Sequence, residues 1–284
     1  MKNTLLILFV ITFFSFNAYA QENTVPTSGN DCGEHCSWKI EGGVLTVTGY
    51  GDIADFPRNC EGGCHNTAPW AASVGTITKV VIENESGTAG FNSVGQWAFT
   101  AMRKLQEVVL PDGLKKIGHG AFLGDNKLTT VNLPSSLTSI GGFAFDDTRL
   151  TSVEIPPLVT TLDGCSFGNI RATEVVIPEN VTTIAPHAFT ISDGTSDMPL
   201  EKLYCPEHLQ AQCAEAIKFR TDNGLKTEII SYQKNNDGSI LYQNKWYKTA
   251  NDILSGNHIH KRIYTVDEAN KISGKSNTFK IRYK

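Results

Sequence analysis

The sequence lacks an excess of charge of either sign. It has 25 Lys and Arg residues against 29 Asp and Glu residues, which gives a formal net charge of −4 at pH 7. Proteins that bind nucleic acids need a basic surface field, so this balance argues against a nucleic-acid partner. After residue 20 there is also no apolar run of about 20 residues, the length that spans a bilayer. These absences leave a globular protein without a membrane span.

The N-terminus is typical of a secretory signal peptide. Lys2 gives a short basic start, residues 5–16 are almost wholly apolar, and the small residues Ala18 and Ala20 fit a cleavage site. Cleavage there makes Gln21 the first residue of the mature chain. The sequence therefore predicts a protein that is secreted or held at the cell surface, with the periplasm as the alternative compartment.

Cysteines in an exported protein meet oxidising conditions, in which close pairs form disulfides. The seven cysteines, all beyond the predicted cleavage site, are Cys32, Cys36, Cys60, Cys64, Cys165, Cys205 and Cys213. The first four predict two bridges within the N-terminal segment, with three connectivities open. Their spacing also permits a four-thiolate zinc site, and free thiols are the third alternative. We expect Cys205 and Cys213 to form another bridge, which leaves Cys165 as the unpaired thiol.

A short apolar pattern recurs along the middle of the chain. Each copy has apolar residues at its first, fourth and sixth positions, and a proline follows in the clearest copies. The copies begin at Ile77, Leu105, Leu128, Leu150, Ala172 and Leu200. Alternation at the end of each copy is typical of a strand with one buried face. Because proline cannot donate a ladder hydrogen bond, it ends each predicted strand.

A second apolar signature follows the strands. It spans residues 114–117, 137–140, 159–162 and 181–184, and a small residue and a phenylalanine come shortly after it. The phenylalanines of this series are Phe99, Phe122, Phe145, Phe167 and Phe189. We expect Phe122, Phe145 and Phe167 to stack into one buried spine. A repeat of about 22 residues cannot bury its apolar side alone, so the copies must stack into a solenoid with a parallel sheet on one face.

Residues 77–205 resemble the leucine-rich repeat of the BspA-like, treponemal type. The resemblance rests on the pattern L-x-x-V-x-L-P-x-x-L-x-x-I followed by A-F, which four consecutive copies fit. It implies a right-handed, strand-rich α/β-type solenoid in an exported surface protein. It also implies adhesion to host or neighbouring-cell proteins.

Both ends of such a stack need covers, because each exposes an apolar cross-section. We expect residues 1–20 to be the signal peptide and 21–76 an N-terminal cap, with a hairpin turning at Gly42 and Gly43 and with Trp38 pointing inward. Residues 77–206 hold the repeats. Residues 207–284 form a small α+β C-terminal module, in which a helix over 207–223 closes the stack and a hairpin turns at Asp237 and Gly238.

The motifs that could carry catalysis all have a simpler structural interpretation. Residues 164–168 match the G-x-S-x-G nucleophile elbow, but Ser166 occupies a small packed slot of the repeat. In other repeats that slot holds Ala98, Ala121, Ala144 and Ala188. His258 and His260 lack a third metal ligand. We therefore predict no catalytic residue, no cofactor and no metal site, and a hydrolase within the C-terminal module is the remaining enzymatic alternative.

The outward residues of the repeat strands are the candidate binding site, because partners of leucine-rich repeats usually lie on the concave sheet. The candidates are Lys79, Val81, Gln106, Glu107, Val109, Thr130, Asn132, Ser152, Glu154, Glu174, Val176, Lys202 and Tyr204. This face has one aromatic residue, whereas tight interfaces usually centre on Trp, Tyr or Arg. Weak or multivalent binding is therefore expected.

The sequence thus predicts an exported, non-enzymatic protein that binds a surface protein, such as a host matrix protein, on the concave face. The alternative is a structural spacer or envelope component. From His258 onward seven Lys and Arg residues stand against two acidic residues. In the alternative, this basic C-terminal module is the part that attaches the protein.

Overall fold

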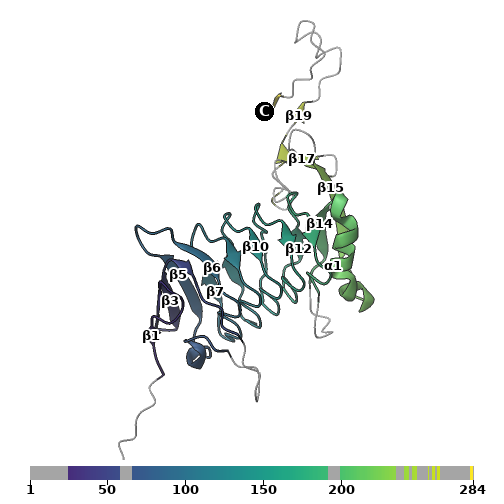
Figure 1. The fold of residues 1–284 in the computed structure, drawn as a ribbon. Coiled ribbons are helices and arrows are strands. Elements are labelled where there is room, and N and C mark those ends of the chain that lie inside the picture. The colour runs from purple at the N-terminus through teal and green to yellow at the C-terminus, as the bar shows by residue number, and fades with distance from the viewer. Residues whose placement is uncertain are drawn as a thin grey trace, which may run out of the picture.

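The computed structural model describes residues 25–57, 66–190 and 199–234, together with Ser255 and five short strands beyond residue 234. The predicted signal peptide, Cys60, Cys64 and much of the C-terminal module lie outside the described residues. Figure 1 shows successive turns of the chain side by side from β5 to β14. In the part described, no helix combines the length and apolar character needed to cross a membrane.

The described chain begins with an antiparallel hairpin. Its strands are β2 (Cys36–Glu41) and β3 (Val44–Gly49), flanked by β1 (Ser28–Gly29). Gly42 and Gly43 form the turn with φ of 56° and 82°, a left-handed conformation that glycine adopts without strain. Trp38 is buried and donates its indole N–H to Asp31 Oδ1 at 2.7 Å. β3 then pairs in parallel with the first repeat strand, so the hairpin is continuous with the repeats.

The repeat strands form two parallel ladders along one side of the molecule. The first sheet has the order β1-β2-β3-β5-β7-β9, and its repeat strands are β5 (Lys79–Asn84), β7 (Glu107–Val109) and β9 (Thr130–Asn132). Another sheet begins with β12 (Glu174–Val176), β14 (Lys202–Pro206) and β15 (Glu228–Lys234). The segment 151–155 lies between them in sequence and is linked by a single bridge, Glu154 to Val176.

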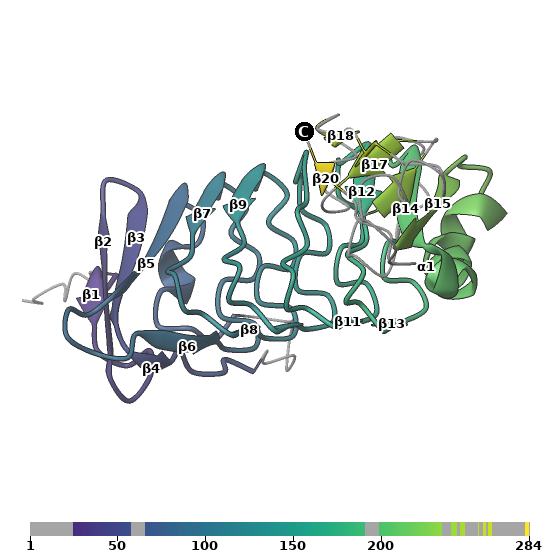
Figure 2. The same cartoon turned by 90° about the horizontal axis from the view of Figure 1, so that it is seen from above.

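A further parallel sheet forms from the second apolar signature. Its order is β13-β11-β10-β8-β6-β4. The strands are β4 (Gly51–Asp52), β6 (Phe91–Val94), β8 (Lys116–Ile117), β10 (Ser139–Ile140), β11 (Thr161–Leu162) and β13 (Thr183–Ile184). In Figure 2 these strands lie opposite β5, β7 and β9. The predicted parallel sheet on one face is thus present, and the return segments form a further sheet that was not predicted.

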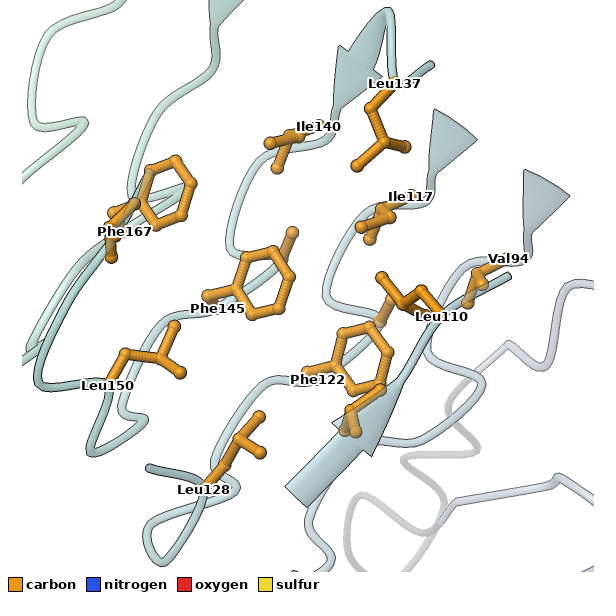
Figure 3. Packing of buried hydrophobic residues seen from close by; sticks show 14 of the residues in the cluster. Val94, Leu110, Ile117, Phe122, Leu128, Leu137, Ile140, Phe145, Leu150 and Phe167 are labelled. Atoms are coloured by element: carbon orange, nitrogen blue, oxygen red, sulfur yellow. The ribbon is translucent and has the colours of Figure 1, made fainter. Parts of the chain in front are cut away.

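The predicted aromatic spine is confirmed and is longer than expected. Phe99, Phe122, Phe145, Phe167 and Phe189 stack in sequence, with ring centroids 5.3–6.0 Å apart and interplanar angles of 7–12°. We call these five residues the Phe spine; all are at most 1% exposed. Trp70, just before the 3-10 turn η1 (Ala71–Ser73), stacks on Phe99 at 5.1 Å. Figure 3 shows three members of the spine, Phe122, Phe145 and Phe167, among leucines and isoleucines of the repeats.

In each of these repeats a small residue precedes the phenylalanine of the spine, and the residue before that small residue has a left-handed backbone conformation. This slot holds Trp97, Gly120, Phe143, Cys165 and His187, with φ between 56° and 66°. Glycine has no steric cost there, whereas the other residue types are strained by about 1–3 kcal/mol. The same slot turns the chain from the second signature toward the core in every repeat, so the strain is a requirement of the repeat geometry.

The repeats are followed by a β–helix–β unit. After β14 come the 3-10 turn η2 (Glu207–Leu209), helix α1 (Gln210–Asp222) and β15, which pairs in parallel with β14. The predicted apolar stripe is confirmed, since Leu209, Cys213, Ala216 and Ile217 are all buried.

Beyond β15 the described strands pair in antiparallel fashion. β15 pairs with β16 (Ile240–Tyr242), β16 with β17 (Lys245–Tyr247), and β17 with β18 (His258–Ile259). A separate pair joins β19 (Lys261–Arg262) to β20 (Arg282–Tyr283). The turn predicted between β15 and β16 lies outside the described residues.

Candidate functional site

Two rows of side chains run across the repeat strands, and we call them together the strand face. The first row is Lys79, Glu107, Thr130, Ser152, Glu174 and Lys202; the second is Val81, Val109, Asn132, Glu154, Val176 and Tyr204. Strand register aligns Lys79 with Glu107 and Thr130, and Val81 with Val109 and Asn132. The same holds for Glu174 with Lys202 and for Val176 with Tyr204. Strand pairing thus brings the candidates of β5, β7 and β9 together, and those of β12 and β14 together with Glu154. Ser152 and Gln106 lie outside these strands, and both are exposed.

Opposite charges on the strand face are paired across strands. Lys79 Nζ lies 3.0 Å from Glu107 Oε1, and Lys202 Nζ lies 2.6 Å from Glu174 Oε1. All four side chains are 31–45% exposed, so solvent screens these pairs and each adds little stability. Their effect is to cancel charge at both ends of the first row. The polar centre between them is Thr130 and Ser152, both exposed.

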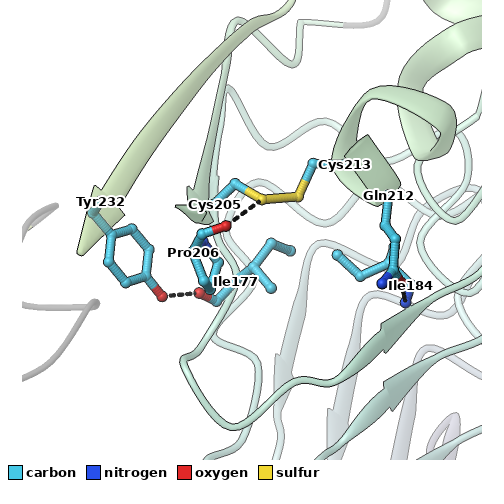
Figure 4. The surroundings of a disulfide bond; sticks show 7 residues. All are labelled: Ile177, Ile184, Cys205, Pro206, Gln212, Cys213 and Tyr232. Atoms are coloured by element: carbon cyan, nitrogen blue, oxygen red, sulfur yellow. Dashed lines mark hydrogen bonds between the residues drawn. A yellow bond between two sulfur atoms is a disulfide. The ribbon is translucent and has the colours of Figure 1, made fainter. Parts of the chain in front are cut away.

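Two of the predicted contact residues are not accessible, which corrects the expectation for them. Val176 is 1% exposed and Tyr204 is 5% exposed. They are cross-strand neighbours, and large apolar side chains in such positions pack on one another. Beside them Tyr232, itself 2% exposed, reaches across from β15 and donates its hydroxyl hydrogen bond to the Ile177 carbonyl oxygen (Figure 4).

Tyr232 is a structural residue that the repeat pattern could not reveal, because it lies outside the repeats. Its burial, with a smaller effect of nearby Glu179, raises the pKa of the phenol well above its usual range. The hydroxyl therefore stays protonated and remains a hydrogen-bond donor. On the strand face, burial of Val176 and Tyr204 ends the second row, so the part accessible in both rows runs from β5 to the segment 151–155.

Ser166 and Cys165 lie in surroundings that do not activate a nucleophile. Ser166 is fully buried, and its Oγ has no hydrogen-bond partner among the residues that the structure describes. Burial, assisted by the charge of Asp146, raises the pKa of the Cys165 thiol to about 11. A reactive cysteine needs a lowered pKa. These environments are those of packed side chains, as predicted for Ser166.

The cysteine pairs of the described region form disulfides. Cys32 is joined to Cys36, and Cys205 to Cys213. Figure 4 shows the second bridge, which fastens the start of α1 to β14. Because Cys32 and Cys36 bond each other, they offer no thiolates to zinc. Within the described ranges, no group of three or more His, Cys, Asp or Glu side chains is placed to hold a metal ion.

Comparison with protein families identifies the repeats. Six copies of the BspA type leucine rich repeat region match residues 75–195. Residues 75–195 of this chain therefore carry leucine-rich repeats of the BspA type. This confirms the resemblance seen in the sequence.

Solved structures of bacterial leucine-rich repeat proteins are similar to this chain. A leucine-rich repeat protein from Eubacterium ventriosum ATCC 27560 is 25% identical with a TM-score of 0.51, over 63% of this chain and 44% of that chain. The T. pallidum leucine rich repeat protein is 18% identical with a TM-score of 0.42, over 72% and 86% of the two chains. A leucine rich cell surface protein from Faecalibacterium prausnitzii A2-165 is 17% identical with a TM-score of 0.35, over 76% and 60%.

The Eubacterium ventriosum protein supports the leucine-rich repeat fold of this chain. The chain spans less than half of that protein's length. A comparison with curated proteins gives no match.

Proposed function

We propose that this protein is an exported, non-enzymatic binding protein that holds a surface or matrix protein on the strand face of a leucine-rich repeat solenoid. The observation that carries the proposal is the accessible part of the strand face. There, strand register presents side chains of successive repeats to solvent as one continuous surface. The hairpin β2–β3 and the unit β14–α1–β15 act as covers at the two ends of the solenoid. The two disulfides of the described residues favour an oxidising, extracytoplasmic location.

The size of this surface sets the strength of binding. From β5 to the segment 151–155 there are three strand spacings of about 4.8 Å, and β7 and β9 are three residues long. At about 3.3 Å per residue these strands measure about 10 Å, so the surface is roughly 150 Å². A stable protein interface takes about 800 Å² from each partner. The face therefore suits weak or multivalent capture, as expected for an adhesin that acts in many copies.

A charge-substitution experiment tests the proposal. Replacing Val109, Asn132 and Glu154 together by lysine places three like charges on the strand face without entering the core. We expect the variant to fold normally and to lose capture by the extracellular matrix protein that the wild type binds most strongly in a panel, if that protein is basic or apolar.

A matched control separates this effect from net charge. Replacing Ser139, Asp163 and Thr183 by lysine gives the same charge change at exposed positions on or beside β10, β11 and β13, on the opposite side. This variant should bind like the wild type. Equal loss in both variants, or no loss in the first, would contradict the strand-face site.

The spacer function is the second candidate, and its supporting observation is the basic composition after residue 258. Deleting everything after residue 206 would also remove Tyr232 and β15, which pack on the repeats, so it cannot test this idea. The spacer function is tested instead by replacing the seven Lys and Arg residues of 258–284 by glutamine. If this glutamine variant is no longer retained on cell envelopes while the strand-face variant is retained, the result favours the spacer function.

A further inference from the structure

A row of basic side chains follows the edge at which the chain enters the repeat strands. Lys104, Lys127 and Arg149 each directly precede the buried leucine that opens a repeat, and Arg103 stands beside the first of them. We call these four residues the basic ladder. The chain as a whole carries a net charge of −4, so four neighbouring cations are a local departure from its composition.

Backbone hydrogen bonds between adjacent turns set the spacing of the ladder. The Arg149 N–H donates to the Leu128 carbonyl at 2.9 Å, and the Thr129 N–H donates to the Gln106 carbonyl at 3.1 Å. Figure 3 shows Leu128 and Leu150, the residues that follow Lys127 and Arg149, at matching places in adjacent turns. With strands about 4.8 Å apart, the ladder covers about 10 Å along the repeat axis.

The ladder is not neutralised as the strand face is. All four side chains are exposed, and none makes an ion pair or side-chain hydrogen bond with the residues that the structure describes. On the strand face, by contrast, Lys79 and Lys202 are each paired with a glutamate. Like charges on neighbouring strands destabilise one another, so the ladder weakens the fold slightly.

Nearby acidic groups do little to offset the ladder. Asp125 precedes Lys127 by two residues but is fully buried, and burial raises its carboxyl pKa well above 3.8. Asp146 is also buried and accepts a hydrogen bond from Asn169. Asp147 is the exposed acid of this region, and it has an interaction of its own. Anionic groups brought by a ligand can therefore approach the ladder.

We infer that the basic ladder binds a linear sulfated or carboxylated polysaccharide. Cations repeating at the strand spacing match a chain whose anionic groups recur along one axis, and a sugar unit in an extended chain has a similar length. A nucleic acid fits less well, since sequence-independent binding of single strands needs aromatic side chains for base stacking beside the basic groove. Phe143, the exposed phenylalanine of these repeats, instead lies near β10, with its ring against His119. The ladder is a second binding surface and does not depend on the strand-face proposal.

Binding of the purified full chain to a size-defined heparin oligosaccharide tests the inference. The ladder variant replaces Arg103, Lys104, Lys127 and Arg149 by glutamine. We expect its Kd to rise by about tenfold or more at about 0.15 M salt, with a shallower dependence on salt, because fewer counterions are released.

Two controls identify which cations are responsible. The first replaces four other exposed lysines by glutamine: Lys115, Lys116, Lys218 and Lys226. The second replaces the seven basic residues of 258–284 by glutamine. Both should keep most of the affinity. If either loses as much as the ladder variant, or if the ladder variant binds normally, the inference is wrong.

Two further probes identify the ligand class and its source. Chondroitin sulfate represents a host polysaccharide, and a carboxylated bacterial polysaccharide represents an envelope polymer. Ladder-dependent binding of either supports the inference and indicates the source. Single-stranded DNA of matched charge that binds as tightly as heparin, also through the ladder, would overturn the assignment to polysaccharide.

Discussion

Replacing Phe145 by alanine would remove one ring from the middle of the Phe spine. Phe145 is fully buried and stacks on Phe122 at 5.3 Å and on Phe167 at 5.6 Å. The rings on both sides are held by their own repeats, so the cavity cannot close by collapse. The substitution should lower the free energy of unfolding by about 3–5 kcal/mol, of which each stacked pair contributes about 0.5–1.5 kcal/mol.

Urea unfolding followed by circular dichroism and by tryptophan fluorescence measures this loss. Coincidence of the two transitions tests whether the repeats still unfold together. Phe143→Ala is the matched control, because Phe143 is two residues away and 37% exposed. It should cost less than about 1 kcal/mol. A loss below about 1 kcal/mol for Phe145→Ala, or equal losses for both variants, would refute the stacked-spine argument.

Two further substitutions test buried polar groups of the repeats. Ser166→Ala removes a buried hydroxyl without a partner and leaves the side chain found at Ala144, so the free energy of unfolding should stay equal or rise by about 1 kcal/mol in the same urea assay; a clear loss would contradict this. Asp125→Asn keeps the acceptor for the Met102 N–H, which Asp125 Oδ1 binds at 2.7 Å, and removes a carboxyl whose pKa burial raises well above 3.8. The Asp125 carboxyl stays protonated in the native wild type, whereas it loses its proton in the unfolded chain. The free energy of unfolding of the wild type therefore falls as the pH rises from about 4 through the native pKa of Asp125. The variant's advantage should therefore grow by about 1.4 kcal/mol per pH unit over that interval, and equal pH profiles would show that Asp125 is not buried in this way.

The sequence by itself determined the features that depend on contacts between adjacent repeats. A residue type that recurs at one register must meet its copy in the next turn, so the Phe spine and the parallel pairing of β7 with β9 could be predicted. The buried stripe of α1 and the Cys205–Cys213 bridge followed from local spacing in the same way. The first row of the strand face was predictable because its members are related by the repeat.

Only the tertiary structure decided features that join segments of different kinds. The second signature has the pattern of a return segment, and its pairing into a sheet depends on the twist and stacking of whole turns. The choice of Cys36 as the partner of Cys32 depended on the local path of the chain before β2. The place of Tyr232 depended on the pairing of β15 with β14, which brings its hydroxyl to a carbonyl 55 residues away in sequence. A periodic pattern carries information about contacts between equivalent residues, and Tyr232 has no equivalent in the repeats.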